Sequence, residues 1–352
     1  MEKVCLLDLT YDELRSFIKG INQKPFRAKQ IFQWIHKGVE SFDEMTNIPV
    51  ETRKKLSEIS TISRIRILEK LRSKLDDTIK YLFLLEDGNI IEGVLMRYSY
   101  GNTLCISSQV GCKMGCRFCA STLNGLVRHL RPGEMLGQVL TVNNDLRNGN
   151  RKRSVTNVVI MGTGEPLDNY ENTVKFLRNI SHPEGFHMSL RNISLSTCGL
   201  VPQILALADE NLPITLSVSL HAPDDDTRQK IMPIGKIYKI RDILDACRVF
   251  INKTGRRVIF EYALIAGIND SLEQARMLAD ILRGLQCHVN LIPLNPVAER
   301  EYSASSKNDI HRFRKQLERM HISVTQRREL GTDINGACGQ LRRKYLKAHG
   351  KI

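Results

Sequence analysis

The 352-residue chain lacks the apolar run of about 20 residues that a membrane-spanning helix needs. Its first ten residues mix charged side chains with an apolar piece that is too short for a secretory signal. It also has no long internal repeat and no low-complexity tract. These absences disfavour membrane, secreted and repeat proteins. They predict a protein of the cytoplasm that has no membrane partner.

Cysteine occurs in an odd number that does not suggest a disulfide framework. The chain has nine cysteines, and in a reducing compartment such residues are more often ligands or reactive thiols than bridges. The hydrophobic fraction of 42% and the aromatic fraction of 6% are typical of an ordinary soluble enzyme. A chain of this length can form one large core, or one core and a small accessory domain.

Basic residues outnumber acidic ones throughout the chain. Lysine and arginine total 52 against 38 acidic residues, which gives a formal net charge of +14 and a pI near 9.4. The excess recurs in the clusters at 151–153, 327–328 and 342–344. Any one cluster can be ordinary solvated surface. The excess of basic over acidic residues in the whole chain nevertheless predicts a polyanionic partner, and nucleic acid above all.

Three cysteines stand close together in one short loop. Cys112, Cys116 and Cys119 have C-x3-C-x2-C spacing, and Gly111 and Gly115 let the backbone curl so that three thiolates can converge. Iron–sulfur clusters are normally held by four cysteines, so a set of three leaves one iron for a ligand that is not protein. Structural zinc also requires four protein ligands, which disfavours a zinc site here.

The first 75 residues read as a small helical unit. Thr10-x-x-Glu13 is a capping box that opens one amphipathic helix. Further helices are predicted to begin at Pro25 and at Pro49. No catalytic motif occurs in this unit, which we interpret as an accessory domain that contacts RNA.

The hydrophobic period then changes to two, which is typical of strands. Thr78–Leu85 and Asn89–Arg97 flank an Asp-Gly turn, and they predict a β-hairpin within 76–102. Glu92 lies in an apolar stretch of the second strand. On spacing alone, the simplest interpretation makes it the solvent-facing member of an alternating strand.

Strands and helices alternate through the rest of the chain, from 103 to 330. Repeated βα units require a mainly parallel sheet with right-handed crossovers, either open and doubly wound or closed into a barrel. The candidate strands are Thr103–Ser107, Thr156–Met161, Asn192–Ser196, Ile214–Leu220, Val258–Leu264 and His288–Ile292, with a seventh piece at Ile322–Gln326. Helical patterns separate them at about 134–146, 170–180, 201–209, 239–252 and 271–284, and a further helix is expected at about 307–320.

Polar or glycine-rich motifs follow most of these strands. In a βα barrel the reacting groups lie at the carboxyl ends of the strands. The motifs are the cysteine loop, Gly-Thr-Gly-Glu-Pro at 162–166, Ser-Thr-Cys-Gly at 196–199, Ser-Leu-His at 219–221 and Pro-Leu-Asn-Pro at 293–296. Each motif alone is weak evidence for a functional site, since the glycine-rich motif can form an ordinary turn and His221 can have a purely structural role. Together they predict a pocket.

The segment 331–341 is short and polar, and it carries a lone cysteine. Cys338 stands between alanine and glycine, so it is sterically open to an attacking or accepting group. The alternative is an inert, buried thiol. Cys105, near the end of the first strand, has the same ambiguity. The cysteines interpreted as structural are Cys5, Cys198, Cys247 and Cys287.

Together these residues resemble the radical S-adenosylmethionine (SAM) superfamily, and more narrowly the RlmN and Cfr group of RNA adenine methyltransferases. The cysteine spacing and the Gly-x-Gly-Glu-Pro strand end carry the first resemblance, and Ala-Cys-Gly-Gln-Leu at 337–341 carries the second. The resemblance covers almost the whole chain. It implies an α/β fold, a partial TIM-type (βα)6 barrel over 103–330, with the helical domain 1–75, the hairpin extension 76–102 and a C-terminal segment 331–352.

The resemblance also implies the cofactors and their ligands. Cys112, Cys116 and Cys119 would hold a [4Fe-4S] cluster whose fourth iron binds SAM, and two SAM molecules would be used in each turnover. The residues that would position SAM are Gly164, Glu165, Ser196, Ser219, Leu220, His221 and Asn295.

Adenine C2 is electron-poor and carries no acidic proton, so ordinary methyl transfer cannot reach it. By the resemblance, Cys338 would first accept a methyl group, and a radical made from the second SAM would take a hydrogen from it. The resulting carbon radical would add to C2. Cys105 would then resolve the adduct by attacking the Cys338 sulfur, which leaves a disulfide. Glu92 would be the base, so the resemblance overrides its solvent-facing interpretation.

The implied substrate is an adenosine of 23S rRNA at the peptidyl-transferase centre, with the adenosine 3' of the anticodon in some tRNAs as a second candidate. Leu167 after the Gly-Glu-Pro motif resembles the C2-methylating branch. Asn335 and Gly336 depart from the usual aspartate and alanine, and neither change removes a reacting atom. The resemblance further implies a monomer served by an electron donor such as flavodoxin or ferredoxin.

Two alternatives stay open at this point. One is a C8-adenine rRNA methyltransferase of the Cfr type, which differs in the position that is methylated. The other is a non-enzymatic RNA-binding protein whose three cysteines hold a structural metal. Analysis of the RNA product separates the three hypotheses, which predict an adenine methylated at C2, an adenine methylated at C8 and unmodified RNA.

Overall fold

The computed structural model of the chain describes residues 3–62, 65–147, 154–334, 341–342 and 345–346. Several predictions fall on residues outside these ranges: the basic cluster 151–153, most of the cluster 342–344, the departures at Asn335 and Gly336, and Cys338. Within the described ranges, no helix has the length and apolarity to cross a bilayer.

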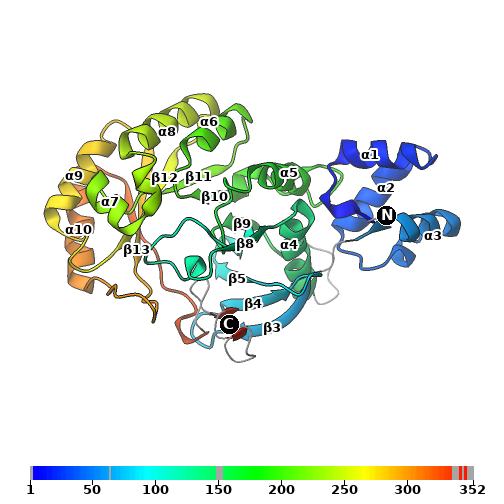
Figure 1. The fold of residues 1–352 in the computed structure, drawn as a ribbon, viewed down its shortest axis with the longest axis horizontal. Coiled ribbons are helices and arrows are strands. Elements are labelled where there is room, and N and C mark those ends of the chain that lie inside the picture. Colours follow the sequence, from blue (N-terminus) through cyan, green and yellow to red (C-terminus); the bar gives the residue numbers. More distant parts are fainter. Residues whose placement is uncertain (1–2, 63–64, 148–153, 335–340, 343–344, 347–352) are drawn as a thin grey trace.

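The N-terminal unit is helical, as predicted, and lies to one side of the sheet (Figure 1). In the capping box, the Thr10 hydroxyl accepts from the Glu13 N–H and the Glu13 carboxylate accepts from the Thr10 N–H. Pro25 and Pro49 are the N-caps of the next two helices. The unit comprises β1 (Val4–Cys5), α1 (Tyr11–Gly20), α2 (Phe26–His36), α3 (Val50–Ile59) and β2 (Ser60–Thr61), with short 3-10 turns at Leu6–Asp8 and Phe42–Glu44.

A cluster of rings joins this unit to the rest of the molecule. Tyr11 stacks on His182 with ring centroids 4.6 Å apart, and Phe32 stacks on His36 at 4.0 Å. His36 is buried, its Nδ1 accepts from the Phe186 N–H at 3.2 Å, and its buried Nε2 has no hydrogen-bond partner among the described residues. Burial, and the nearby His182, lower the pKa of His36 to about 3. The imidazole is therefore held neutral at this joint.

The main sheet has ten strands in the order β14-β13-β12-β11-β10-β9-β6-β5-β4-β3. All neighbours from β6 to β14 pair in parallel, so the predicted parallel sheet is confirmed, and it stays open. Its strands are β3 (Arg66–Arg72), β4 (Ile79–Leu84), β5 (Ile90–Tyr98), β6 (Gly101–Ile106), β9 (Asn157–Ile160), β10 (Ile193–Thr197), β11 (Thr215–Ser219), β12 (Val258–Leu264), β13 (Cys287–Pro293) and β14 (Val324–Gln326).

The predicted hairpin is present and has a further strand beside it. β4 and β5 pair antiparallel, with Leu82 opposite Glu92. β3, which the sequence did not predict, pairs antiparallel with β4 and forms one edge of the sheet. Its side chains alternate between exposed and half-buried, so its apolar signal is weak.

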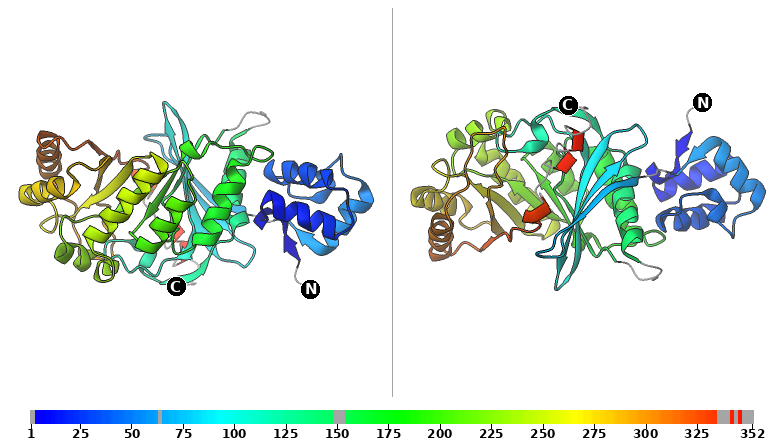
Figure 2. Two further views of the ribbon diagram at one scale, coloured as in Figure 1. Left: turned by 90° about the horizontal axis from the view of Figure 1, so that it is seen from above. Right: turned by 90° about the horizontal axis from the view of Figure 1, so that it is seen from below.

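Helices cover one face of the sheet (Figures 1 and 2). On β12, Val258, Phe260 and Tyr262 belong to the core under the helices, whereas Glu261 and Ala263 line a pocket on the opposite face. We call this opposite face the inner face. Six helices match predicted ones and α7 was not predicted; they are α4 (Pro132–Arg147), α5 (Tyr170–Ser181), α6 (Val201–Asp209), α7 (Asp225–Ile231), α8 (Ile240–Thr254), α9 (Leu272–Leu282) and α10 (Lys307–Arg319).

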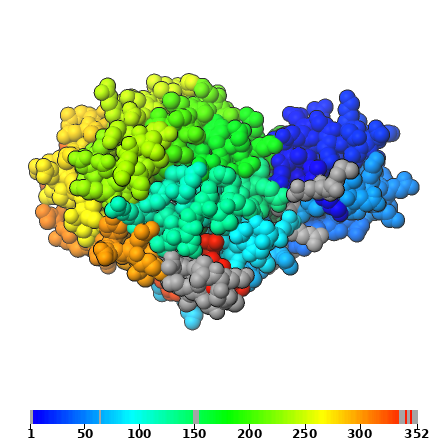
Figure 3. Space-filling model, viewed as in Figure 1, coloured from blue at the N-terminus to red at the C-terminus, as the bar shows by residue number. Residues whose placement is uncertain are grey.

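The described end of the chain returns to the hairpin. Leu341 packs in a small apolar cluster with Leu82 and Ile90. Arg342 donates its Nε–H to the Ile90 carbonyl at 2.6 Å. Figure 3 shows the described C-terminal part of the chain, in red, between the cyan and the blue-green parts of the surface. The C-terminal end is thus anchored on the strand that contains Glu92.

The joint at His36 predicts a pH dependence of stability. Because the folded state lowers the pKa of His36 from 6.5 to about 3, the unfolded state binds the proton first on acidification. The free energy of unfolding should therefore fall as the pH drops below about 6.5, by at most about 1.4 kcal/mol per pH unit from this residue. Urea unfolding of wild type and His36→Phe between about pH 7.5 and about pH 5.5 measures this pH dependence. The free energy of unfolding should change less steeply with pH in the variant.

His311→Phe is the matched control, since His311 is exposed on α10. Its slope should equal that of wild type. Equal slopes for wild type and His36→Phe would contradict a neutral, buried His36.

Candidate active site

The cysteine loop is shaped by a small separate hairpin. β7 (Gln109–Gly111) pairs with β8 (Leu126–His129), and the loop runs between them. Gly111 has φ +81°, and a Cβ at this position would lie 2.0 Å from the Gly125 carbonyl oxygen. Gly115 has φ +71°. The predicted curl at both glycines is therefore present, and Gly111 has no room for any side chain.

Hydrogen bonds hold the loop closed. The Cys112 N–H donates to the Gly125 carbonyl at 2.8 Å. The Thr122 hydroxyl lies 3.0 Å from the carbonyl oxygens of both Cys116 and Cys119. These contacts tie the backbone of the loop behind its cysteines and leave the thiols to face the sheet.

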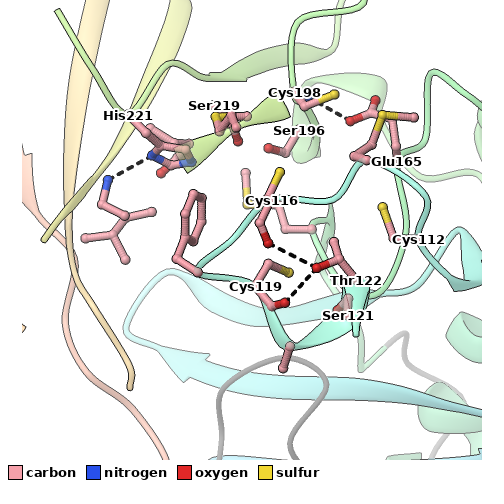
Figure 4. A pocket seen from close by; sticks show the side chains of 18 of the residues that line it. Cys112, Cys116, Cys119, Ser121, Thr122, Glu165, Ser196, Cys198, Ser219 and His221 are labelled. Atoms are coloured by element: carbon pink, nitrogen blue, oxygen red, sulfur yellow. Dashed lines mark hydrogen bonds between the residues drawn. The ribbon is translucent and has the colours of Figure 1, made fainter. Parts of the chain in front are cut away.

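The three thiols open into one pocket of about 280 Å³ (Figure 4). The predicted motifs at the strand ends form its opposite wall. Gly164, Glu165, Ser196, Ser219, His221 and Asn295 all line it. Leu220 differs, because its side chain is in the core and only its backbone lies near, with its N–H donated to the Glu261 carbonyl at 3.1 Å.

The donor set fits a polynuclear iron cluster. Burial raises the pKa of the Cys112 thiol to about 12, and burial with the neighbouring thiols raises the pKa of Cys116. A bound cation would offset that penalty by favouring the thiolates. Across the described part of the chain, no three His, Cys, Asp or Glu side chains are placed to hold a single metal ion. Three soft ligands spread around one space suit a larger, multi-iron group.

Glu165 is fixed in the pocket wall. Its carboxylate accepts from the Cys198 N–H at 2.7 Å and from the Leu167 N–H at 3.0 Å. Burial raises the pKa of Glu165, and the hydrogen bonds from Cys198 and Leu167 lower it in part. Gly164, with φ +112°, brings the backbone so close to Gln109 that a Cβ would lie 2.6 Å from the Gln109 Cβ. The carboxylate therefore faces the pocket from a rigid turn.

His221 is a neutral part of the same wall. Its backbone is left-handed, with φ +57°, and its Nδ1 accepts from the Ala263 N–H at 2.9 Å. The ring makes an edge contact with Phe118, with centroids 4.9 Å apart. Burial lowers the pKa of His221 to about 3. The neutral ring therefore carries its hydrogen on Nε2.

Comparison with known proteins decides the family. Residues 4–62 match the family described as "Ribosomal RNA large subunit methyltransferase N-terminal domain", and residues 106–279 match "Radical SAM superfamily". "Probable dual-specificity RNA methyltransferase RlmN" of Alkaliphilus oremlandii is 55% identical over 99% of this chain and 100% of that protein. The chain belongs to the RlmN family.

Two further relatives agree with this assignment. The protein of the same name from Clostridioides difficile is 54% identical, over 98% of this chain and 99% of that protein. The crystal structure of a radical SAM methyltransferase from Sphaerobacter thermophilus matches with a TM-score of 0.91 at 42% identity, over 96% of this chain and 98% of that one. The predicted radical SAM fold and the cofactor classes, a [4Fe-4S] cluster and SAM, are thereby confirmed.

In this RlmN family chain, Glu92 does not face solvent. Its side chain is on the inner face and the residue is 3% exposed, so the interpretation from spacing alone is wrong. A strand with both faces covered has no solvent side. Lys80, which is fully buried, places its Nζ 3.1 Å from Glu92 Oε2, and the Arg342 N–H donates to Oε1. The carboxylate thus links the hairpin to the end of the chain.

Cys105 lies on the same face, one strand away. Val94, two residues after Glu92, is paired with Cys105 across β5 and β6. Cys105 is buried in an apolar cluster with Val94, Met96 and the partly buried Met161. Met161 also lines the pocket of the cysteines. Cys105 is therefore linked to that pocket through Met161, and Glu92 lies on the same face two residues from the register partner of Cys105.

Sequence reasoning missed several members of this RlmN pocket. Cys198, interpreted as structural, lines it, as do Phe118, Glu261 and Arg327. Glu261 had a detectable signal, because it is a carboxylate in the apolar stretch Val-Ile-Phe-Glu-Tyr-Ala-Leu, as Glu92 is in its own strand. Arg327 was noticed only as part of the basic cluster 327–328, which did not indicate a place in the pocket.

Gly111→Ala should prevent the loop from holding iron. The added Cβ would meet backbone, which cannot move aside cheaply, and a side chain at positive φ costs about 1–3 kcal/mol in addition. Iron and sulfide content after reconstitution, with the visible absorbance of the cluster, should fall several-fold. Gly20→Ala, at a helical position with open space around it, should load as wild type does. Full loading of Gly111→Ala would rule out this role for the turn.

Lys80→Met should destabilise the protein by about 3–5 kcal/mol, because it leaves the Glu92 carboxylate buried without its cation. The double variant Lys80→Met/Glu92→Leu should recover much of this loss. Lys70→Met is the control, since Lys70 pairs with Asp145 at the surface and should cost no more than about 1 kcal/mol. Urea unfolding midpoints measure all three. A Lys80→Met variant as stable as Lys70→Met would contradict the buried pair.

Proposed function

We propose that this protein methylates C2 of an adenosine in 23S rRNA at the peptidyl-transferase centre, and C2 of the adenosine 3' of the anticodon in some tRNAs. The relatives that cover the whole chain are named dual-specificity RNA methyltransferases, which supports both substrates. The observation that carries the proposal is the inner face of the sheet. On this face Cys105 belongs to a cluster with Met161, which lines the pocket of Cys112, Cys116 and Cys119, and Glu92 lies two residues from Val94, the register partner of Cys105; both support the proposal.

In this proposal Cys112, Cys116 and Cys119 hold the cluster, and the pocket wall holds SAM. Bound there, the two cofactors supply a carbon radical by one-electron chemistry. Glu165 accepts from the ammonium group of SAM, Ser196 and Ser219 offer hydroxyls, and the neutral ring of His221 adds a donor without charge. Gly164, Leu220 and Asn295 complete the set, with Leu220 contributing backbone only.

The chain's own thiols carry the methyl group. Cys338, which lies outside the described residues, accepts it by displacement as a thiolate. Once the carbon is joined to adenine C2, Glu92 takes the C2 proton and the radical adduct returns one electron to the oxidised electron donor. The Cys105 thiolate then attacks the Cys338 sulfur, and the carbon–sulfur bond breaks with its electron pair on the carbon. That carbon takes a proton and becomes the methyl group, and the disulfide that remains is reduced by an external thiol. Leu341 and Arg342, the nearest described residues after Cys338, contact the strand of Glu92, which supports this assignment.

The remaining features of the proposal concern partners and organisation. The net charge of +14 favours binding to RNA. The domain division 1–75, 76–102, 103–330 and 331–352, the cytoplasmic location, the monomeric state and an electron donor such as flavodoxin or ferredoxin are parts of the same proposal.

Cys338→Ala should abolish methylation while leaving the cluster intact. The substitution removes the sulfur that carries the methyl group, so no 2-methyladenosine should form in rRNA or tRNA, as measured by mass spectrometry of digested RNA. Cys247→Ala, at a buried position of α8 outside the pocket, should keep its activity. Formation of 2-methyladenosine by Cys338→Ala would refute the proposed carrier. Formation of 8-methyladenosine by wild type would refute the proposed position.

A further inference from the structure

A second cavity, of about 590 Å³, adjoins the pocket of the cysteines on the inner face. The two share Met161, Glu261 and Arg327 in their linings, so these three side chains stand between the two spaces. The size falls in the range of about 300–1,000 Å³ that is usual for small-molecule sites. The cofactor assignment leaves this second space unassigned.

One wall of the second cavity lies against the proposed resolving thiol. Met96, Val159 and Met161 line the cavity, and the same three side chains pack in one cluster with Cys105. A group bound in the cavity would therefore contact side chains that belong to the cluster of Cys105. In the proposed function, Cys105 attacks the sulfur that is joined to the adenine, so the adenine must lie near these side chains.

Glu261 stands where the two spaces meet. It is 4% exposed, on the inner face of β12, and its Oε2 accepts from Asn290 Nδ2 at 2.8 Å. Asn290 is its register partner on β13. Burial raises the pKa of Glu261, while nearby Arg327 lowers it in part. The proposed reaction gives this buried carboxyl group no role.

The mouth of the second cavity has the chemistry of a single-stranded RNA site. The rings of Tyr98 and Tyr100 are parallel, with centroids 4.9 Å apart and an interplanar angle of 6°, and Tyr100 is 69% exposed. Arg97 and Arg328 are exposed beside them. Single-stranded RNA is bound by stacking of bases on aromatic rings and by cations along its phosphates.

We propose that the second cavity receives the acceptor adenosine and that Glu261, positioned by Asn290, accepts a hydrogen bond from the N6 amino group of the base. The inference rests on the proposed function, and it assigns the site for its RNA substrate. Guanine carries an oxygen in place of N6 and would face the Glu261 oxygen with a second acceptor, so the same contact selects adenine. C2 and C6 flank N1 in the ring. A contact at N6 therefore fixes the direction in which C2 points.

The test compares RNA that carries adenosine at the target position with RNA that carries purine riboside, which lacks only the N6 amino group. The holoenzyme with SAM and without reductant binds each RNA, and fluorescence anisotropy gives the Kd. Wild type should bind the purine riboside RNA about 10- to 100-fold more weakly, as expected for one lost hydrogen bond to a charged acceptor. Glu261→Gln and Glu261→Ala should bind both RNAs with the same, weaker affinity.

Two controls separate this role from others. Glu273→Gln, an exposed change on α9, should keep the wild-type discrimination. Tyr100→Ala, at an exposed position that should not affect folding, should weaken binding of both RNAs by about tenfold through lost stacking.

Three results would overturn the inference: equal binding of both RNAs by wild type, full discrimination by the Glu261 variants, or loss of SAM binding in them, which would place Glu261 in the cofactor site. Absence of 2-methyladenosine from a wild-type reaction with reductant is a different result. It would refute the proposed function itself, whatever the two RNAs show in binding.

Discussion

Alternation of side chains along the strands is the constraint on which the rest of this structure depends. On β12, Phe260 lies in the core under the helices and Glu261 lies on the inner face. On β11, Val218 and Ser219 divide in the same way. A shift of one residue in register would exchange the two sets and bury the polar groups under the helices. The apolar half of each strand therefore holds the sheet in the register that its polar half requires.

Several charged side chains buried near the site have partners within the chain before any cofactor or RNA is considered. Glu92 has Lys80, and Glu165 has two backbone N–H groups. Arg228, fully buried, donates to the Cys198 carbonyl at 2.7 Å and the Tyr238 carbonyl at 3.2 Å. Burial of an unmatched charge would cost several kcal/mol, so these partners also fix the side chains in place. The site is consequently rigid on the side that faces the ligands.

Much of the fold could be predicted because buried strands and amphipathic helices have strong periods. The Asp-Gly turn, the capping box at Thr10 and the glycines of the cysteine loop gave correct local structure for the same reason, since each needs a particular residue type. β3 and α7 were missed, because an edge strand has little apolar signal and α7 has only seven residues. The structures of β3 and α7 therefore depend more on the elements that they pack against than on their own sequences.

The residues of the candidate site also fall into a group that the sequence could predict and a group that it could not. Loop residues at strand ends, such as Glu165 and His221, could be found because glycine and polar residues interrupt apolar patterns there. Glu92 and Glu261 lie within strands, where a single carboxylate reads as an outward-facing residue unless both faces are known to be covered. Only the assembled sheet shows that the inner face is enclosed. The spacing of residues in the sequence does not show whether both faces of a strand are covered.

Glu92 shows how the ends of the chain and the site are coupled. Lys80 and the Arg342 N–H each contact one of its oxygens. The same carboxylate therefore takes part both in docking the described C-terminal residues and in the proposed chemistry. Arg342 follows Cys338 by four residues in the sequence, so its contact with Glu92 joins the chain next to the proposed methyl carrier to the strand of the proposed base.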